Sequence, residues 1–177
     1  MLTGLNVCLA PILDEDHGLL FQWLNSVALA RYSAPFRPVD HSQFQNWLHR
    51  AGTDPSRIYF TIRQAVTLRL LGYLELIHFH PVNRSAELGM LIGENMDQNQ
   101  GFGQEAVRLA LHFCWREMNL NRVSLKVRVD NARAIRVYLK CGFEAEGVLR
   151  QAAYIDGAFV DMMVMAALRP DPLPDRL

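Results

Sequence analysis

Hydrophobic residues recur along this chain at two different spacings, which together predict an alternation of strands and helices. In segment 103–118, Val107, Ala110, Leu111 and Cys114 lie three or four positions apart, as on one face of a helix. Runs rich in β-branched, aromatic and leucine residues are typical of strands. We expect helices over 14–25 and 103–118, two helices capped by Asp40 and Asn131, and strands over 5–12, 57–64, 68–79, 86–92, 122–129, 143–155 and 158–168.

Turn residues divide these elements and indicate how they connect. Gly142 stands where a helix would end in a left-handed residue, and Asp156-Gly157 is a strong signal for a two-residue hairpin turn. The order is a meander of strands, then a strand-helix-strand-helix unit, then a closing hairpin. This order predicts an α/β fold: one domain over 1–169 with a mixed, mostly antiparallel twisted sheet and helices on both faces. The proline-rich segment 170–177 is expected to be a frayed tail.

Composition narrows the class of protein. Of the 177 residues, 50% are hydrophobic and 20% are charged, which excludes a disordered chain. The three cysteines form no C-x-x-C pair, and no apolar run approaches a membrane span. We therefore expect a cytoplasmic protein without a membrane segment, either a monomer or a homodimer.

Charge is unevenly distributed, although the net charge is zero. Between Gln98 and Lys140 the chain carries eight basic and three acidic residues, so this stretch is +5 and the remainder is −5. Overall neutrality argues against nucleic acid as a partner, whereas the basic stretch suits a local anionic ligand. A solvated helix face accounts for the same excess equally well.

A glycine-containing loop, Gln98-Asn99-Gln100-Gly101-Phe102-Gly103, lies between a predicted strand and the long helix. Glycines let a backbone approach an anion closely, and the free N–H groups at a helix start point towards it, so the loop predicts a phosphate site. Gly101-x-Gly103-x-x-Ala106 also fits a dinucleotide fingerprint. Against that interpretation, the nearest suitable acid, Asp130, comes 29 residues after Gly101 instead of about 20.

Three segments resemble the GNAT superfamily of acetyl-CoA-dependent N-acetyltransferases. The first is the string Gln98-x-x-Gly101-x-Gly103, which is similar to the pyrophosphate loop of that superfamily. The second is Asn131 to Phe143, similar to its "N-x-x-A-x-x-x-Y-x-x-x-G-F" signature. The third is Asn83 to Gly89, which with Glu146 to Arg150 resembles the branch of ribosomal-protein N-terminal and spermidine acetyltransferases. The likeness runs from about residue 7 to residue 168.

The resemblance implies how acetyl-CoA would bind. The sheet would splay open, and the backbone of Met90, Leu91 and Ile92 would pair with the pantetheine arm of the coenzyme. Asn131 and Ala134 would lie beside the far end of that arm. The pyrophosphate would be bound by the loop residues Gln98, Asn99, Gln100, Gly101, Phe102, Gly103 and Gln104. No metal is expected.

Acyl transfer through a tetrahedral intermediate needs a neutral amine, a donor to the oxyanion and a proton for the departing thiolate. By the resemblance, a backbone N–H near Leu91 would be the donor and Tyr138 the general acid, because a phenol at ~10 can protonate a thiolate at ~8.5. Glu75 and Glu87 are both carboxylates in apolar strands and both candidates for the base. We favour Glu87, which matches a family position lining the acceptor cleft, and a water relay is a third possibility.

Other polar residues have simpler explanations. His78 and His80 would share a strand face, but no third metal ligand is evident. Cys141 has no base partner and is interpreted as structural. Two rival functions stay open: a non-catalytic acyl-CoA-binding regulatory module, and a small nicotinamide-dependent oxidoreductase.

The acceptor is expected to be a primary amine, either a protein N-terminal α-amine or a small molecule such as an amino sugar. Between Asn25 and Gly52 the only acid is Asp40, against Arg31, Arg37 and Arg50, a balance that would repel a polyamine. Deprotonating a lysine-like amine at pH 7 costs ~4.6 kcal/mol, whereas an α-amine costs ~1.4 kcal/mol. A polyamine acceptor remains the alternative.

Overall fold

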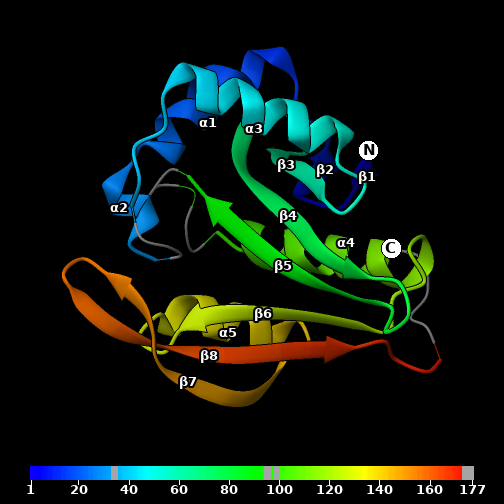
Figure 1. Cartoon of the computed structure of the whole chain (residues 1–177). Helices are drawn as coiled ribbons and strands as arrows, with labels where there is room; N and C mark the ends of the chain where they lie inside the picture. The colour runs from blue at the N-terminus through cyan, green and yellow to red at the C-terminus, as the bar shows by residue number, and fades with distance from the viewer. Residues whose placement is uncertain (33–35, 94–96, 98–99, 173–177) are drawn as a thin grey trace.

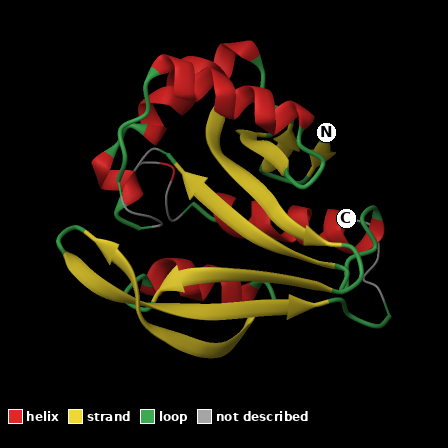
Figure 2. Cartoon of the chain, in the orientation of Figure 1, coloured by secondary structure: helices red, strands yellow, loops and turns green. Residues whose placement is uncertain are grey.

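Eight strands form one sheet, in the order β1-β2-β3-β4-β5-β6-β8-β7 (Figures 1 and 2). The computed structural model describes residues 1–32, 36–93, 97 and 100–172. Neighbouring strands are antiparallel except β5 and β6, which are parallel. The strands are β1 (Leu2–Thr3), β2 (Val7–Ala10), β3 (Ile58–Gln64), β4 (Leu70–His80), β5 (Ser85–Ile92), β6 (Arg122–Arg128), β7 (Glu144–Ile155) and β8 (Ala158–Leu168).

The helices begin and end largely where their capping residues predict. Asp40 accepts a hydrogen bond from the Gln43 N–H at 2.8 Å, and Asn131 Oδ1 accepts one from the Ala134 N–H at 3.1 Å. Gly142 has a φ of 88°, as expected of a left-handed residue after a helix. The helical elements are the 3-10 turn η1 (Asp14–Asp16), α1 (His17–Leu24), α2 (Val27–Ala30), α3 (His41–Thr53), α4 (Phe102–Arg116) and α5 (Ala132–Lys140).

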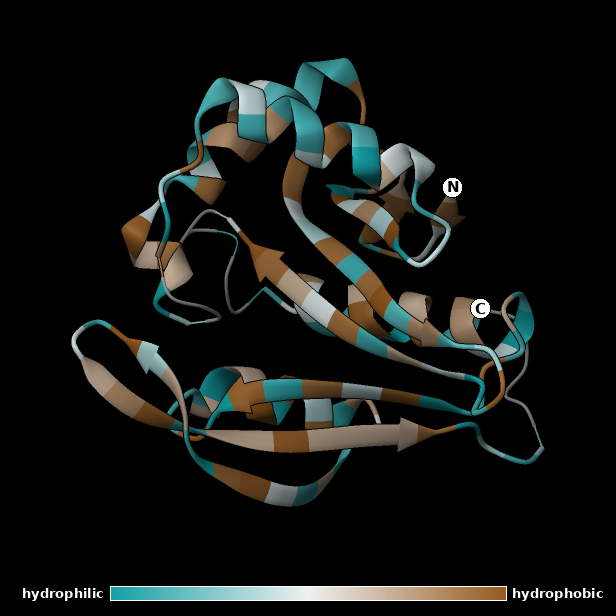
Figure 3. Ribbon diagram, viewed as in Figure 1, coloured by the Kyte–Doolittle hydropathy of each residue, from teal (hydrophilic) through white to brown (hydrophobic). Residues whose placement is uncertain are grey.

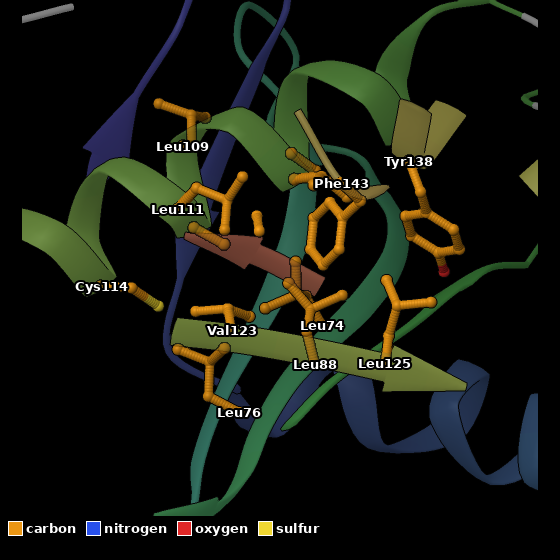
Figure 4. Close-up of a cluster of buried hydrophobic side chains, with 14 of the residues drawn as sticks. Leu74, Leu76, Leu88, Leu109, Leu111, Cys114, Val123, Leu125, Tyr138 and Phe143 are labelled. Carbon is orange, nitrogen blue, oxygen red and sulfur yellow. The ribbon is translucent and has the colours of Figure 1, made fainter. Parts of the chain in front are cut away.

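The two faces of the sheet are covered by different helices (Figure 1). α4 and α5 pack on one face, over a core that includes Leu74, Leu88 and Phe143 (Figure 4). α1 and α3 pack on the other face, where Trp23 and Phe44 form a second buried cluster. Apolar and polar residues alternate along much of β4, as Figure 3 shows. Because successive side chains of a strand leave opposite faces of the sheet, Leu74 joins one core and Tyr73 the other. The predicted mixed α/β fold is confirmed.

Several boundaries differ from the sequence-based expectation. The first main strand is only Val7–Ala10, since Pro11 has no N–H to extend the ladder. The helix expected over 14–25 is divided because the buried carboxylate of Asp16 accepts from the Leu13 N–H at 2.8 Å and pairs with Arg63, which holds a tight 3-10 turn. β1 and α2 were not predicted, being two and four residues long.

The end of the domain and the tail are only partly described. β8 ends at Leu168, and the Arg169 N–H still donates to the Asn121 carbonyl at 2.9 Å. The boundary at residue 169 stays a prediction, and residues 173–177 of the expected tail lie outside the described residues. Within the described part of the chain, no helix is long and apolar enough to cross a lipid bilayer.

Candidate active site

The sheet opens between its two parallel strands. β5 pairs with β6 only at Ser85–Glu87, opposite Arg122–Ser124, and the two strands then diverge (Figure 1). A cavity of about 690 Å³ lies where they separate. The predicted splaying of the sheet is therefore present, and it leaves the second half of β5 with one open edge.

The open edge presents particular backbone groups. The Gly93 N–H donates to the Leu71 carbonyl at 2.9 Å. In a regular antiparallel ladder alternate residues face the same way, so Leu91 and Gly89 turn their N–H groups towards β4. Met90 and Ile92 consequently direct theirs to the open side. A donor to an oxyanion near Leu91 is thus available from Met90, not from Leu91 itself.

The start of α4 forms one end of the cavity. Gly101 is its N-cap, with a φ of 84°, and the first intrahelical bond runs from the Glu105 N–H to the Gly101 carbonyl at 3.1 Å. The amides of Phe102, Gly103 and Gln104 precede this bond and are the anion-binding groups of a helix start. A Cβ at Gly101 would meet nothing within 4 Å, whereas one at Gly103 would lie 3.2 Å from Met90 Cε.

Most of the residues predicted to bind the cofactor surround this cavity. Gln100 and Phe102 do not line it; Phe102 instead packs against the core under α4. Gln98 and Asn99 lie outside the described residues. The predicted residues that line it are Met90, Leu91, Ile92, Gly101, Gly103, Gln104, Asn131 and Ala134.

An acid at this end of the cavity was missed by sequence reasoning. Asp97 is buried and lines the cavity, and both its oxygens bind Arg69, at 2.6 and 2.8 Å. Arg69 directly precedes β4, so the ion pair ties Asp97 to the sheet. In the sequence Asp97 looks like a negative charge placed unfavourably before a phosphate-binding loop. Its partner Arg69 stands 28 positions earlier, so the ion pair could not be seen from sequence.

Tyr138 reaches the cavity from α5. Its side chain is 7% exposed and lies at the edge of the core beside Phe143 and Leu125 (Figure 4). Burial, together with the nearby Cys141 thiol, raises the pKa of Tyr138 to about 12. The phenol is therefore a weaker acid than the ~10 expected from sequence, and it stays protonated at any physiological pH.

Glu75 and Glu87 lie on the same face of the sheet, and both line the cavity. Glu75 stands opposite Gly89, and a Cβ at that glycine would lie 2.8 Å from Glu75 Oε1, so the missing side chain makes room for the carboxylate. Burial raises the pKa of Glu75, and the neighbouring Glu87 carboxylate raises it further. A raised pKa makes this carboxylate a stronger base than an exposed one.

Glu87 is in a more polar setting. Its side chain is 27% exposed, with Oε2 3.5 Å from Lys126 Nζ and 3.3 Å from His78 Nδ1. Lys126, the cation in this contact, also lines the cavity. Lys126 was not singled out from sequence, since it appeared only within the basic stretch.

The histidines and Cys141 do not form a further centre. His78 has a φ of 56° and interrupts the register of β4, so it contacts Glu87 while His80 accepts from the Asn83 N–H at 3.1 Å. His80 is the cross-strand partner of Ser85, which lies on the same side of β5 as Glu87, in keeping with the expected shared face. Among the described residues no three His, Cys, Asp or Glu side chains gather around a metal position. Burial raises the pKa of Cys141 to about 11, in keeping with its structural interpretation.

The arginines counted against a polyamine do not surround the cavity. Arg31 lies 3.4 Å from Asp156 in the β7–β8 turn, and Arg50 Nε donates to the Asn46 carbonyl within α3. Neither these two nor Arg37 lines the cavity, so that charge count was wrong as a description of the acceptor side. The described charged residues that do line it are Glu75, Glu87, Asp97, Lys126 and Arg133.

Comparisons with known proteins agree with this geometry. A sequence model described as acetyltransferase (GNAT) domain matches residues 6–144. The chain is 34% identical over 100 residues to a spermidine N(1)-acetyltransferase of Vibrio cholerae, an alignment that covers 56% of this chain and 57% of the relative. It is 32% identical over 99 residues to a ribosomal-protein-serine acetyltransferase of Escherichia coli, with coverages of 56% and 55%. The chain thus spans little more than half the length of these two relatives.

A solved structure extends the comparison to nearly the whole chain. It is a spermidine N-acetyltransferase from Vibrio cholerae in complex with CoA and spermine, with a TM-score of 0.85 and 26% identity. The superposition covers 92% of this chain and 95% of the other. The fold and the motif-based resemblance are both confirmed.

Proposed function

The chain belongs to the GNAT acetyltransferase family, and on that premise we propose that it transfers the acetyl group of acetyl-CoA to a primary amine. The main support for this proposal is the cavity between β5 and β6, which ends at the N-terminus of α4. An open strand edge suits the amide groups of a pantetheine arm, and a helix start suits a pyrophosphate. The described residues therefore fit acetyl-CoA.

The roles of individual residues follow from their positions. The amides of Phe102, Gly103 and Gln104 hold the pyrophosphate, and the backbone of Met90 and Ile92 holds the pantetheine arm. Asn131 uses Oδ1 to cap α5, which leaves its amide NH₂ for a ligand in the cavity that it lines.

Glu75 is the proton acceptor in this proposal. It takes a proton from the acceptor ammonium, directly or through a water molecule, and the freed nitrogen lone pair attacks the thioester carbonyl carbon. The N–H of Met90 donates to the oxygen that becomes negative. As the carbon–sulfur bond breaks, Tyr138 gives its proton to the departing thiolate. The attacking nitrogen loses its second proton as the amide forms, and that proton restores the Tyr138 phenol, directly or through a water molecule. We assign the base to Glu75 over Glu87 because burial raises the pKa of Glu75, whereas Glu87 is paired with Lys126.

The acceptor is a primary amine with a single positive charge, such as a peptide α-amine or an amino sugar. Asp97 is paired with Arg69 and Glu87 with Lys126. Glu75 is the one carboxylate among the described cavity residues for which no ion pair is seen. One open carboxylate suits one ammonium group. A polyamine is the second candidate, supported by the spermidine enzymes among the relatives.

Isothermal titration tests the cofactor. We expect acetyl-CoA to bind with one site per chain and NADPH to give no heat beyond dilution. Binding of NADPH in preference to acetyl-CoA would replace this proposal with a nicotinamide-dependent oxidoreductase.

A further inference from the structure

A row of polar side chains leads from the exposed end of α3 to Glu75. Asp54, which ends α3, lies 3.3 Å from Arg57 Nε. Arg57 Nη1 in turn donates to the Tyr59 hydroxyl at 3.3 Å. Tyr59 on β3 is the direct cross-strand partner of Glu75 on β4, so their side chains leave the same face of the sheet.

Packing fixes both members of this last pair. Tyr59 is 8% exposed, and its ring packs edge-on against Trp47, with 5.2 Å between the ring centroids. Glu75 lies across Gly89, where a Cβ would displace it. The phenol and the carboxylate are thus held side by side between α3 and the sheet.

We propose that Tyr59 and Arg57 are positioning residues for Glu75, holding its carboxylate ionised and directed into the cavity for the incoming ammonium group. The inference rests on the proposed function, since it concerns the base of that reaction. Tyr59 donates its O–H to Glu75 and receives an N–H from Arg57, so each donor has one acceptor. Tyr59 keeps its proton throughout: the N–H bond of the ammonium breaks, an O–H bond forms on Glu75, and solvent takes that proton after product leaves.

The charges around Glu75 explain why such support is needed. Burial is the main influence that raises the pKa of Glu75, and the carboxylate of Glu87 on β5 adds to it. Hydrogen bonding to Tyr59 lowers this pKa, followed by the charge of Arg57 and then that of His78 on β4. Tyr73, also on β4, faces the same site, and burial beside Glu75 raises the pKa of its phenol, so it stays neutral. Lys126 on β6 pairs with Glu87. Tyr59 and Arg57 are thus the two largest influences that oppose the protonation of Glu75.

The test is the pH dependence of kcat/KM in Tyr59→Phe, which keeps the ring and removes the hydroxyl. A hydrogen bond to a charged group is worth about one to two pH units, so we expect the acid limb to move upwards by about one unit. The rate on the plateau should stay within about threefold of wild type, because Glu75 is fully ionised there. Arg57→Gln should move the limb in the same direction by less, and Arg57→Lys should restore it. Tyr154→Phe, an exposed tyrosine of the β7–β8 hairpin, is the matched control and should leave the profile unchanged.

The outcomes separate this inference from the proposed function. A uniform loss of rate at every pH in Tyr59→Phe would show a packing role and overturn the inference. If that variant fails to fold, the difference between Arg57→Gln and Arg57→Lys decides in its place, and no difference overturns the inference. NMR titration of the Glu75 side-chain carboxyl carbon in the ligand-free protein gives the same shift without turnover. A wild type without acetyl transfer would therefore remove the proposed function, while an unmoved Glu75 titration in Tyr59→Phe would remove this inference alone.

Discussion

The two walls of the cavity are built on different principles. On the cofactor wall, the groups that we propose bind the ligand are backbone amides at the start of α4 and along the open edge of β5. On the acceptor wall, the chemistry depends on charged side chains from β4, β5 and β6, each adjusted by a partner on another strand. Backbone groups are nearly indifferent to side-chain exchange, whereas a carboxylate such as Glu75 changes its behaviour with each neighbour. Mutations on the cofactor wall should therefore act by changing the position of the backbone amides. Mutations on the acceptor wall should act by changing the protonation of Glu75.

The largest effect is expected from Tyr138→Phe, where the two walls meet. Loss of a general acid costs ~10²–10⁴-fold in rate, so kcat should fall within that range. The dissociation constant of acetyl-CoA should hardly change, because the ring still packs on Phe143. Steady-state kinetics with a titration of acetyl-CoA measures both, and a variant as fast as wild type would return Tyr138 to a purely packing role.

Replacing Glu75 and Glu87 one at a time tests which of the two carboxylates on the acceptor wall is the base. Glu75→Gln should lower kcat/KM by ~10²-fold, which is the low end of the range for loss of a general base. It should also abolish the acid limb of the pH profile. Glu87→Gln should cost less than tenfold and keep the limb, since Glu87 is paired with Lys126 and is not the proposed base. Because burial raises the pKa of Glu75, the limb in wild type should lie above the ordinary carboxyl range, with activity falling as the pH drops through it. A larger loss in Glu87→Gln would reverse the assignment.

A pair of glycine variants tests the cofactor wall by geometry alone. Gly101 and Gly142 have φ values of 84° and 88°, and neither would place a Cβ within 4 Å of another atom. Alanine at either position carries a similar strain of ~1–2 kcal/mol. Gly101→Ala should weaken acetyl-CoA binding more than tenfold, because Gly101 lines the cavity and Gly142 does not. Gly142→Ala should lose similar thermal stability with affinity intact, and equal affinities for the two variants would contradict the placement of the pyrophosphate.

The smallest effect concerns the acceptor. An additional exposed ion pair is worth ~0.2–1 kcal/mol, or up to roughly fivefold, so charge alone discriminates weakly between amines. We expect kcat/KM for an N-terminal peptide or an amino sugar to exceed that for spermidine by a few-fold at equal ionic strength. A preference for spermidine would show that the paired carboxylates, Glu87 and Asp97, release their partners to bind a polycation.

The cofactor wall was largely predictable from sequence because its signals are local. Gly101 and Gly103 precede a periodic helix, and Asn131 caps a helix that brings Tyr138 to the cavity within one short motif. The backbone direction of Met90 and Ile92 was not predictable, since it depends on the register between β4 and β5.

The acceptor wall was less predictable because its properties arise from pairing between distant residues. Glu75 and Glu87 were both identified from sequence as carboxylates in apolar strands, and the choice between them as the base stays a proposal. Glu87 meets Lys126 from 39 positions away, and Glu75 owes its surroundings to Tyr59 and Gly89. The arginines of segment 25–52 were assigned to the acceptor side by proximity in sequence, whereas tertiary packing directs them elsewhere.

A single-turnover reaction tests the central claim most directly. The claim is that the acetyl group of acetyl-CoA bound at the cofactor wall is transferred to an amine bound at the acceptor wall. Enzyme in excess over acetyl-CoA is mixed with a panel of primary amines at pH 8, and acetylated amine and free CoA are followed by mass spectrometry. We predict one acetylated amine and one free CoA for each acetyl-CoA consumed, at a rate lost in Glu75→Gln. Tight binding of acetyl-CoA without transfer to any amine would contradict the account and leave the chain as a non-catalytic acyl-CoA-binding module.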